Sequence, residues 1–343
     1  MHIHFSTIFI DPYNKKELTL VVFEEQAQNI LSGIYVEPES GNCYPILSGV
    51  AVFLSNSLSK NFLSKYEKEL SEAKAQYPNL NLKDGEVEDW SFSYEWESHT
   101  QDEMNTTWGW TTDKRFNDFL VETEISLNEI ENKWILDAGC GNGQLTDSFA
   151  RHNMTAIGID FSSSVYTAEQ KRKSTNLCFV RGDLQNLPFK KEAFDMVVSN
   201  GVIHHTPNTE NTFYEIAKSV KESGRYYIWL YSRKGTVLWQ IKRYFFDLLR
   251  ILVCRLPAFL QVKAVELTVF LLFPFVKGID KPSFKVAIFD SITPRWRHYH
   301  TPEEVAYWYH KAGFSIIRLT HWHNKYGFGV NAIKTKQTHL AGE

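Results

Sequence analysis

Apolar and polar positions alternate along the middle of the chain in a pattern that predicts an α/β domain. Five short apolar runs are separated by segments of helical length: WILDAG, TAIGID, NLCFVRGD, FDMVVSN and GRYYIWLY, all between residues 107 and 231. Such alternation is typical of buried parallel strands with helices on both faces of the sheet. We expect residues 286–343 to complete this domain.

The C-terminal stretch contains helix-start and helix-stop signals. Thr301 is a candidate N-cap, Pro302 occupies the first helical position, and Glu304 completes a capping box. Gly313 predicts the end of that helix, and FSIIRLT after it predicts a strand. A helix followed by a strand fits the same α/β domain.

The chain before residue 107 has a different character. Residues 1–55 contain β-branched and aromatic runs broken by turn-forming pairs, which predicts a small β-rich domain. Residues 56–106 predict a polar helix and a linker, because eleven acids and four lysines lie between Lys65 and Glu103. Residues 232–285 interrupt the α/β domain and predict a helical insertion.

Composition and charge narrow the class of protein. Of 343 residues, 43% are hydrophobic and 22% are charged, as in globular proteins, so a disordered or fibrous chain is excluded. Subtracting 40 acids from 37 bases gives −3, which offers no general attraction for nucleic acid. The four cysteines are scattered without a C-x-x-C pair, which argues against a disulfide framework or a cysteine zinc site. The N-terminus lacks the basic segment and cleavage site of a signal peptide, so we expect a cytoplasmic protein.

The strongest functional signal is the segment WILDAGCGNGQLT, residues 134–146. An apolar strand ends near Asp137 and is followed by Gly139, Gly141 and Gly143 before a helix begins. Glycines at such a turn let the backbone adopt positive φ and lie against a ligand, and the helix start offers free N–H groups. An ordinary glycine-rich turn has the same pattern, so this segment alone leaves both interpretations open.

Acidic residues at the ends of the next two strands change this picture. Asp160 ends TAIGID, 21 residues after Gly139 (160 − 139), where it can accept the ribose hydroxyls of a nucleotide. Asp183 follows the third strand, where it can accept from an adenine amine. The third glycine comes one residue early for a dinucleotide loop, and Asp137 would repel a pyrophosphate but could hold an ammonium group. The carboxyl ends of parallel strands meet in one crevice, so these groups favour a site for S-adenosylmethionine.

The four strand ends resemble the successive motifs of class I S-adenosylmethionine-dependent methyltransferases, in particular those that methylate small molecules. The motifs are LDAGCGNGQLT, GIDFS, RGDLQNLPF and FDMVVSNGVIHHTPN, within about residues 130–232. The resemblance implies a Rossmann-like, seven-stranded methyltransferase sheet and S-adenosyl-L-methionine as cofactor. It implies Asp160 at the ribose, Asp183 at the adenine, and Phe161 and Leu184 packed against the base. By the same resemblance, the methionine portion lies against Asp137, Gly139, Cys140, Gly141, Asn142 and Gly143, and Asn200 and Gly201 line the sulfonium side.

Motifs that mark base methylation in this family are missing. The fourth strand ends in SNGV, not in an N-P-P-Y motif, and the chain contains no Pro-Cys pair. The resemblance therefore implies a small-molecule acceptor and no nucleic-acid partner.

The N-terminal segment resembles a small zinc-ribbon module. That module is the activator subunit of certain tRNA and protein methyltransferases, and it also occurs fused ahead of small-molecule methyltransferases. DPYN and EPES take the places of its two C-P-x-C motifs, so the four ligand positions fall on Asp11, Asn14, Glu37 and Ser40. Zinc prefers thiolate and imidazole ligands, so we expect a degenerate domain without metal that packs on the methyltransferase domain. A hard-cation site made by Asp11 and Glu37 is the alternative.

Two adjacent histidines after the fourth strand are the candidate catalytic residues. Methyl transfer to an oxygen nucleophile requires removal of a proton, and imidazole titrates near neutral pH. His204 and His205 are placed for that role, with His205 favoured. The alternative is that one of them packs against or caps the following turn.

Three further segments are candidates for the rim of the site. Tyr94 and Trp96 could close over the cofactor and shield its sulfonium, or belong to ordinary core packing. Arg115 could meet the methionine carboxylate. The basic, aromatic segment PRWRHYH, residues 294–300, could line the acceptor site or form a surface loop.

The insertion at 232–285 has an amphipathic helical pattern. Its ten bases and three acids give a local charge of +7, which leaves −10 on the rest of the chain (−3 − 7). Charges recur too often for a membrane span, so we expect a lid over an acceptor pocket. A homodimer contact and a peripheral contact with a membrane surface are alternatives that can coexist with a lid. The apolar stripe consists of Val237, Ile241, Phe245, Leu248 and Leu252, and the polar stripe of Gln240, Arg243, Asp247 and Arg250.

The sequence thus predicts an S-adenosylmethionine-dependent methyltransferase with a degenerate ribbon domain and a helical lid. The expected reaction is O-methylation of a small, apolar or lipid-like metabolite in natural-product or glycan biosynthesis, although N- and C-methylation leave the same motifs. The alternatives are a tRNA or protein methyltransferase, a catalytically silent scaffold that keeps the fold, and another reaction that uses the same cofactor.

Overall fold

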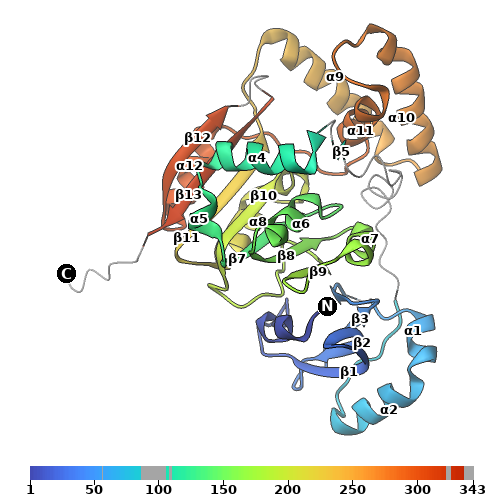
Figure 1. Ribbon diagram of the computed structural model, residues 1–343. Helices are drawn as coiled ribbons and strands as arrows, with labels where there is room; N and C mark the ends of the chain where they lie inside the picture. Colours follow the sequence, from blue (N-terminus) through green and yellow to red (C-terminus); the bar gives the residue numbers. More distant parts are fainter. Residues whose placement is uncertain (56, 86–105, 108–109, 322–325, 336–343) are drawn as a thin grey trace.

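The computed structural model describes residues 1–55, 57–85, 106–107, 110–321 and 326–335, arranged as an α/β fold with a helical insertion (Figure 1). Tyr94 and Trp96 lie outside the described residues. Strands β5 (Thr106–Thr107) and β6 (Trp110–Thr111) form a short hairpin separate from the central sheet.

One mixed sheet forms the centre of the molecule. Its eleven described strands lie in the order β1-β2-β3-β4-β9-β8-β7-β10-β11-β13-β12. From β4 to β11 neighbouring strands are parallel, and β13 is antiparallel to both β11 and β12. The seven strands from β9 to β12 confirm the predicted Rossmann-like sheet. They are β7 (Trp134–Ala138), β8 (Thr155–Asp160), β9 (Leu177–Gly182), β10 (Phe194–Asn200), β11 (Val220–Tyr231), β12 (Phe314–His321) and β13 (Gly327–Lys334).

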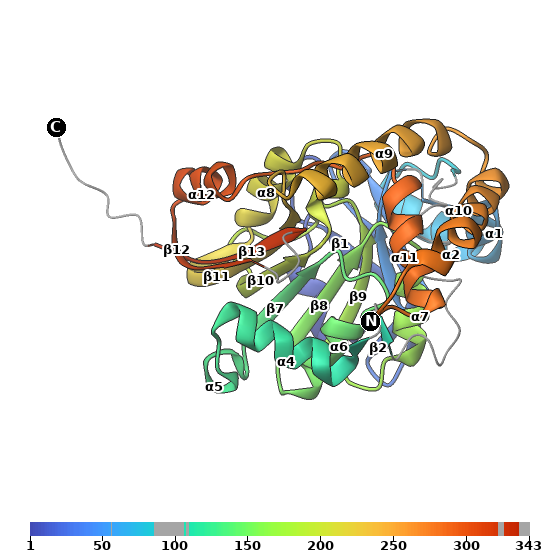
Figure 2. The ribbon, with the colours of Figure 1, turned by 90° about the horizontal axis from the view of Figure 1, so that it is seen from above.

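Helices cover both faces of this sheet (Figure 2). One face carries α4 (Thr112–Thr123), α6 (Gln144–Arg151) and α7 (Ser164–Lys171), with the short α5 (Leu127–Ile130) at its margin. The other face carries α8 (Thr209–Ala217) and α12 (Pro302–Lys311). Each face has its own apolar core, one around Phe119 and Phe149 and the other around Phe213 and Tyr309, all fully or almost fully buried. Each such side chain contributes about 2 kcal/mol of hydrophobic free energy.

The predicted boundaries of the last helix are confirmed. The Thr301 hydroxyl accepts the backbone N–H of Glu304 at 3.3 Å, and the Glu304 carboxylate accepts the N–H of Thr301 at 3.3 Å. Pro302 begins α12, and Gly313, with φ +79°, turns the chain into β12. The reciprocal capping bonds satisfy two N–H groups that a helix start otherwise leaves unpaired.

The N-terminal region extends the central sheet. Strand β4 (Val50–Phe53) pairs in parallel with β9, with Phe53 opposite Gly182, and β1 (Thr19–Gln26), β2 (Asn29–Val36) and β3 (Cys43–Leu47) continue outward in antiparallel order. A 3₁₀ turn, η1 (Ile3–Ile8), precedes these strands, and α1 (Lys60–Lys65) and α2 (Glu67–Gln76) pack on them. The region is thus joined to the central domain by backbone hydrogen bonds as well as by side-chain packing.

The four positions expected at a zinc ribbon form a hydrogen-bonded cluster. The buried Asp11 carboxylate accepts the backbone N–H of Asn14 at 2.9 Å and the hydroxyl of Tyr44 at 3.0 Å. Glu37, also buried, accepts the side-chain amide of Asn14 at 3.0 Å and the N–H of Ser40 at 2.7 Å. Across the described ranges, no group of three or more His, Cys, Asp or Glu side chains is arranged to hold a metal ion. The carboxylates instead bind the N–H groups of the two turns.

The insertion forms a subdomain with its own core. It contains α9 (Val237–Val253), α10 (Ala258–Leu272), the turn η4 (Phe273–Phe275) and α11 (Lys281–Ile292). Phe246, Val265 and Phe289 meet in this core, one from each of the three helices. The last helix continues to Ile292, past the expected boundary at 285, because its buried face belongs to this core.

Candidate functional site

The glycine-rich loop connects β7 to α6 at the centre of the sheet. β7 lies between β8 and β10, so the order of the strands reverses here and a crevice opens at their carboxyl ends. Gly139, Gly141 and Gly143 have φ of +91°, +53° and +76°. A Cβ added at Gly139 would lie 2.3 Å from Cγ1 of Val202, so this position requires glycine. The loop therefore brings bare backbone to the crevice, as predicted.

Asp160 is held against this loop. One carboxylate oxygen accepts the N–H of Gly141 at 2.8 Å, and the other accepts the N–H of Ser162 at 2.9 Å. The side chain is half-buried, and each oxygen keeps acceptor capacity beyond the bond it makes. This fixed carboxylate at the end of β8 can accept the two hydroxyls of a ribose.

Asp137 lies beneath the loop and is buried. Its carboxylate accepts the hydroxyl of Thr146 at 2.6 Å. Burial raises the pKa of Asp137 to about 6, opposed by the Thr146 hydrogen bond and the charge of Arg115, while Asp160 adds to the rise. Burial lowers the pKa of Arg115, and the negative Asp137 opposes that shift. A cationic ligand group would stabilise the ionised form of Asp137.

The residues that follow β8 and β9 supply polar and apolar groups that suit an adenine base. Asp183 is half-buried and accepts the backbone N–H of Gln185 at 2.9 Å, which fixes its carboxylate. Leu184 is buried, whereas Phe161, beside Asp160, has an exposed ring with 41% of its area accessible. An exposed aromatic ring next to a ribose-binding carboxylate suits stacking on a base.

The remaining predicted cofactor residues lie on the same loops. Cys140 is buried, and burial raises the pKa of its thiol well above the ordinary value, so it is not a nucleophile. The Asn142 side chain accepts the N–H of Gln144 at 3.2 Å and shapes the start of α6. Gly201, with φ +80°, follows Asn200 at the end of β10 and donates its N–H to the carbonyl of Trp229 at 3.1 Å. These residues fit a cradle for an adenosine bearing a cationic amino-acid chain.

The two candidate histidines have different surroundings. They lie on the turn η3 (Ile203–His205) after β10. His204 is fully buried, its ring centroid lies 4.2 Å from that of Tyr231, and neither ring nitrogen has a hydrogen-bond partner among the described residues. Burial lowers the pKa of His204 well below its ordinary value, helped by the nearby His205 and Arg297. His204 is therefore a neutral packing residue.

His205 is placed between two acceptors. Its Nδ1 lies 2.9 Å from the carbonyl oxygen of Trp296, which can only accept, so Nδ1 carries a hydrogen. Its Nε2 lies 3.1 Å from Oδ1 of Asp290. Burial alone would raise the pKa of Asp290, but His205, Arg297 and Tyr231 together lower it to about 2. Asp290 is therefore a carboxylate at neutral pH.

Sequence reasoning missed Asp290, which lies on α11 in the insertion. The other carboxylate oxygen of Asp290 accepts the hydroxyl of Tyr231 at the end of β11. The guanidinium of Arg297 lies over the Tyr231 ring at 4.7 Å. The segment 294–300, expected at the acceptor site or on the surface, thus packs against the candidate histidines. Its basic and aromatic composition was the available signal, whereas nothing local in the sequence marks Asp290.

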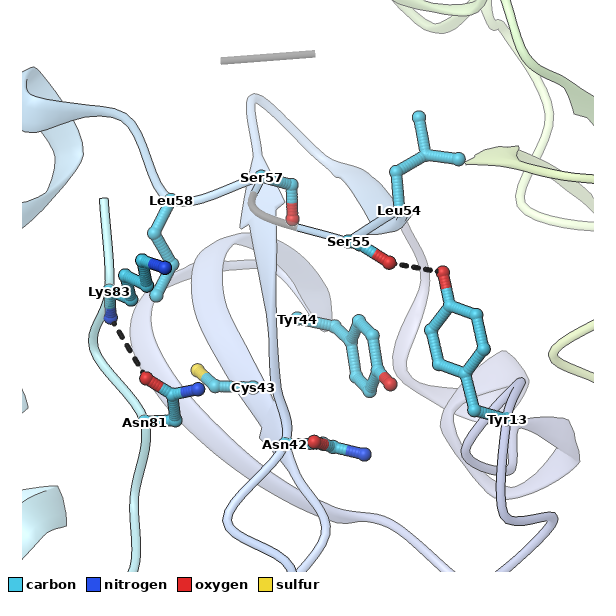
Figure 3. Close-up of a pocket in the computed structure, with 10 residues that line it drawn as sticks. All are labelled: Tyr13, Asn42, Cys43, Tyr44, Leu54, Ser55, Ser57, Leu58, Asn81 and Lys83. Carbon is cyan, nitrogen blue, oxygen red and sulfur yellow. Dashed lines mark hydrogen bonds between the residues drawn. The ribbon is translucent and has the colours of Figure 1, made fainter. Parts of the chain in front are cut away.

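A separate hollow of about 340 Å³ lies in the N-terminal region (Figure 3). The hydroxyls of Tyr13 and Ser55 join across it at 2.6 Å. Burial raises the pKa of the Cys43 thiol in its wall to about 12, so that sulfur is no nucleophile at neutral pH. The lining combines Tyr13, Asn42, Cys43, Tyr44, Leu54, Ser55, Ser57, Leu58, Asn81 and Lys83 and lacks the carboxylates of the crevice.

Comparisons with known proteins match the part of the chain that contains the glycine loop. Residues 136–228 match the family model of a methyltransferase domain. A ubiquinone biosynthesis O-methyltransferase from Coxiella burnetii (strain Dugway 5J108-111) is 25% identical over 108 residues, 31% of this chain and 45% of that protein. A fatty-acid O-methyltransferase from Mycolicibacterium smegmatis is 27% identical over 158 residues, 43% of this chain and 54% of that protein. Magnesium protoporphyrin IX methyltransferase from Synechocystis PCC 6803, solved with bound SAH, aligns with 81% of this chain and all of its own at 16% identity and a TM-score of 0.42.

The central parallel strands and the glycine loop lie largely within the segment that matches the methyltransferase domain. The match therefore identifies a methyltransferase domain at residues 136–228 of this chain. The chain spans about half the length of the curated relatives it matches, 45% of one and 54% of another.

Proposed function

We propose that this protein is an S-adenosylmethionine-dependent methyltransferase that methylates a hydroxyl or carboxyl oxygen of a small, apolar or lipid-like metabolite. The observation that carries the proposal is the contact between His205, on the turn after β10, and Asp290, on α11. An oxygen nucleophile needs a proton acceptor when it is a hydroxyl, and this pair is a suitable one next to the cofactor crevice.

The cofactor residues have separate roles in this proposal. S-adenosylmethionine, when bound, supplies an electrophilic methyl group on its sulfonium. Asp160 would bind the ribose, Phe161 and Leu184 the adenine, and Asp137 the ammonium of the methionine portion. Asp183, fixed by its own loop, would accept from the adenine amine. These contacts align the acceptor oxygen with the methyl carbon, and such alignment is a large part of catalysis in a displacement reaction.

His205 would take the proton of the acceptor hydroxyl. The Trp296 carbonyl holds the hydrogen on Nδ1, so the lone pair of the neutral imidazole is on Nε2. To donate its proton there, the acceptor hydroxyl would have to take the place beside Nε2 that Oδ1 of Asp290 now holds. When Nε2 receives the proton, the Asp290 carboxylate stabilises the imidazolium that forms. A carboxylate acceptor is already ionised and would need no base.

Two observations support an apolar acceptor. Two relatives are named as O-methyltransferases, of ubiquinone biosynthesis and of fatty acids, and both names refer to apolar molecules. The insertion that supplies Asp290 is rich in apolar residues and would form the lid of the acceptor site. A tRNA methyltransferase ranks second, because the net charge of −3 offers no general attraction for RNA.

The direct test is a methyl-transfer assay with isotope-labelled cofactor. Purified protein would be incubated with a panel of apolar alcohols, phenols and fatty acids, together with tRNA and a protein mixture as competing acceptors. The proposal predicts label in an apolar oxygen compound and loss of that label in Asp160→Ala. Label in tRNA or protein alone would contradict the acceptor class. Binding of the cofactor product without transfer to any acceptor would favour a silent scaffold.

A further inference from the structure

The outer surface of α9, α10 and η4 is unusually apolar. Of the 28 exposed large hydrophobic residues in the described parts of the chain, 15 lie between Val237 and Phe275. Single exposed apolar residues are normal on a protein surface, but a contiguous concentration marks an interaction site. The 15 are Val237, Leu238, Ile241, Tyr244, Phe245, Leu248, Ile251, Leu252, Leu256, Phe259, Leu260, Leu267, Phe270, Leu271 and Phe275.

Helix α9 has its apolar stripe turned away from the protein. The five residues of that stripe expose between 57% and 77% of their area, with Phe245 the least exposed and Val237 the most. The polar stripe faces inward instead: the Arg250 guanidinium donates to the carbonyl of Arg295 at 3.0 Å, and Asp247 accepts the Tyr299 hydroxyl at 3.2 Å. A surface helix ordinarily buries its apolar stripe. The orientation of α9 therefore leaves a strongly apolar face without a partner in the fold.

Helix α10 continues this face. Val265 and Val269 point into the core of the insertion and are buried, whereas Phe270 and Leu267 on the opposite side expose 74% and 58%. Phe275 in the turn that follows exposes 84%. In both ribbon views α9 and α10 lie on the outer side of the insertion (Figures 1 and 2). We call this surface, Val237 to Phe275, the outer face.

Exposed cations lie on the helices and turns that carry the outer face, and just beyond them. Lys242, Arg255, Lys263, Lys277 and Lys281 are exposed, and none has an ion-pair partner among the residues that the structure describes. The segment 232–285 carries +7 on a chain with a net charge of −3. An apolar face bordered by unpaired cations is complementary to a surface with apolar interior and anionic border.

We propose that the outer face docks on the surface of an anionic lipid bilayer, with α9 and α10 in the plane of the interface. A second copy of the chain fits less well, because a symmetric contact would bring the same cations against themselves. The positive border distinguishes this surface from an ordinary core contact, and the acidic remainder of the chain would be repelled by the membrane and point away from it.

The length of α10 fits a helix that lies in the plane of the membrane surface better than one that spans the bilayer. The stretch Ala258–Phe275, with a mean hydropathy of 1.6, is long and apolar enough to cross a membrane by length and composition. The expectation that charges exclude a membrane span in the insertion was therefore wrong for this stretch. However, α10 itself has 15 residues, about 22 Å, short of the roughly 30 Å hydrocarbon core. Its inward side is also buried against α9 and α11 at Val265 and Val269, and lipid would have to displace that packing.

The docking surface and the proposed active site are joined through α11. This helix packs on α9 and α10 through Phe289 and carries Asp290, the partner of His205. Docking would therefore hold the mouth of the acceptor site at the membrane, from which an apolar acceptor could enter. Only this last step rests on the proposed function; docking itself requires no methyl transfer.

The test is sedimentation of the full chain with vesicles, without cofactor or acceptor. Phosphatidylcholine vesicles would be compared with vesicles that contain about one third phosphatidylglycerol, at low and high salt. The test variant replaces three residues of the outer face, Ile241→Ser, Phe245→Ser and Leu248→Ser. The matched control replaces three exposed apolar residues elsewhere, Val121→Ser, Ile316→Ser and Leu319→Ser. Thermal unfolding and sedimentation equilibrium would be recorded for each.

The proposal predicts binding to the anionic vesicles that weakens in high salt, at least about tenfold weaker binding of the outer-face variant, and unchanged binding of the control. Retention of the wild-type chain in the supernatant with anionic vesicles would overturn it. A dimer of the wild type that the outer-face substitutions convert to monomer, without vesicle binding, would overturn it in favour of a second copy. Equal vesicle binding of both triple variants would also overturn it. A chain that binds vesicles but transfers no methyl group would retain docking and refute only the proposed function.

Discussion

Nε2 of His205, on the turn after β10, lies 3.1 Å from the carboxylate of Asp290, on the last helix of the insertion. The two residues are distant in sequence, and the contact makes the insertion part of the candidate active site. Tyr231 and Arg297 surround the carboxylate, so its negative charge is retained at neutral pH. The pair therefore joins the insertion to the turn that follows β10.

The role of this pair can be measured in the kinetics. We expect His205→Gln to lower kcat by at least about 100-fold with little change in KM, because it removes the proton acceptor. Asp290→Asn should lower kcat by about tenfold, since positive charge that forms on the imidazole during the reaction loses its counter-ion. A loss of thermal stability in Asp290→Asn with an unchanged kcat would show that Asp290 only holds the insertion in place.

Asp137 predicts a pH dependence of cofactor binding. Burial raises its pKa to about 6, so the carboxylate loses its charge as the pH falls below that value. The affinity for S-adenosylhomocysteine, which carries the same ammonium, should be highest above pH 7 and decrease by up to about tenfold per unit below pH 6. Calorimetry between pH 5 and 8 measures this. Asp137→Asn, the control, should bind weakly with a flat profile; an equally steep profile would assign the dependence to another group.

The raised pKa of Asp137 also predicts how the stability of the fold depends on pH. A carboxyl whose folded pKa is raised favours the folded state when protonated, so its contribution is greatest below about pH 4 and decreases as the pH rises to about 6. In the absence of cofactor, wild type and Asp137→Asn should therefore differ most in urea unfolding above pH 6, with the variant the more stable of the two. The reverse order would mean that the Thr146 hydrogen bond outweighs burial.

Gly139 is the glycine that tolerates a side chain least. Alanine there would combine a φ of +91° with a Cβ 2.3 Å from Val202, so we expect Gly139→Ala to lose about 2–4 kcal/mol of stability. Gly313→Ala is the matched control, because Gly313 has φ +79° but no atom within 4 Å of an added Cβ, and it should lose about 1 kcal/mol. Val202→Ala in the Gly139→Ala background should restore part of the loss. Equal losses of stability in the two glycine variants would show that the contact with Val202 does not destabilise Gly139→Ala.

The N-terminal cluster predicts stability without metal. Asp11→Asn should cost about 2–3 kcal/mol in urea unfolding, because a neutral amide cannot accept the four hydrogen bonds now made by Tyr13, Asn14, Asn42 and Tyr44. Glu39→Gln, on the exposed rim, should change stability by less than about 0.5 kcal/mol. Added zinc should stabilise neither the wild type nor the variant. A zinc-dependent rise in the melting temperature of the wild type would contradict this account.

Local signals in the sequence predicted much of the fold. The apolar runs became β7 to β11, and Thr301, Glu304 and Gly313 bound α12 as expected, because alternation and capping depend on neighbouring residues. The pairing of β4 with β9 could not be predicted, since a strand that joins a sheet edge depends on the edge of a distant segment. The outward turn of α9 was equally hidden: the pattern identified an apolar stripe, but packing decided which stripe is buried.

In the candidate site too, residues placed by their sequence neighbours could be predicted, and residues brought in by distant segments could not. The glycine loop and Asp160 are close in sequence to the strands that place them, and the structure joins Asp160 to Gly141 at 2.8 Å. Asp290 comes from the insertion and is a single acid in an apolar helix, which no spacing rule distinguishes from a surface residue. His204 and His205 had equal local surroundings in sequence, and they are separated only by the polar partners that the fold brings to His205, the Trp296 carbonyl and the Asp290 carboxylate.

The central claim is that this crevice binds S-adenosylmethionine through Asp160. The most direct measurement is calorimetry of S-adenosylhomocysteine with the wild type and with Asp160→Ala, at pH 7.5 or above so that Asp137 is ionised. The account predicts about micromolar binding by the wild type and a loss of at least about 1.4 kcal/mol, or tenfold, in the variant. Absence of binding by the wild type, or equal binding by the two proteins, would contradict it.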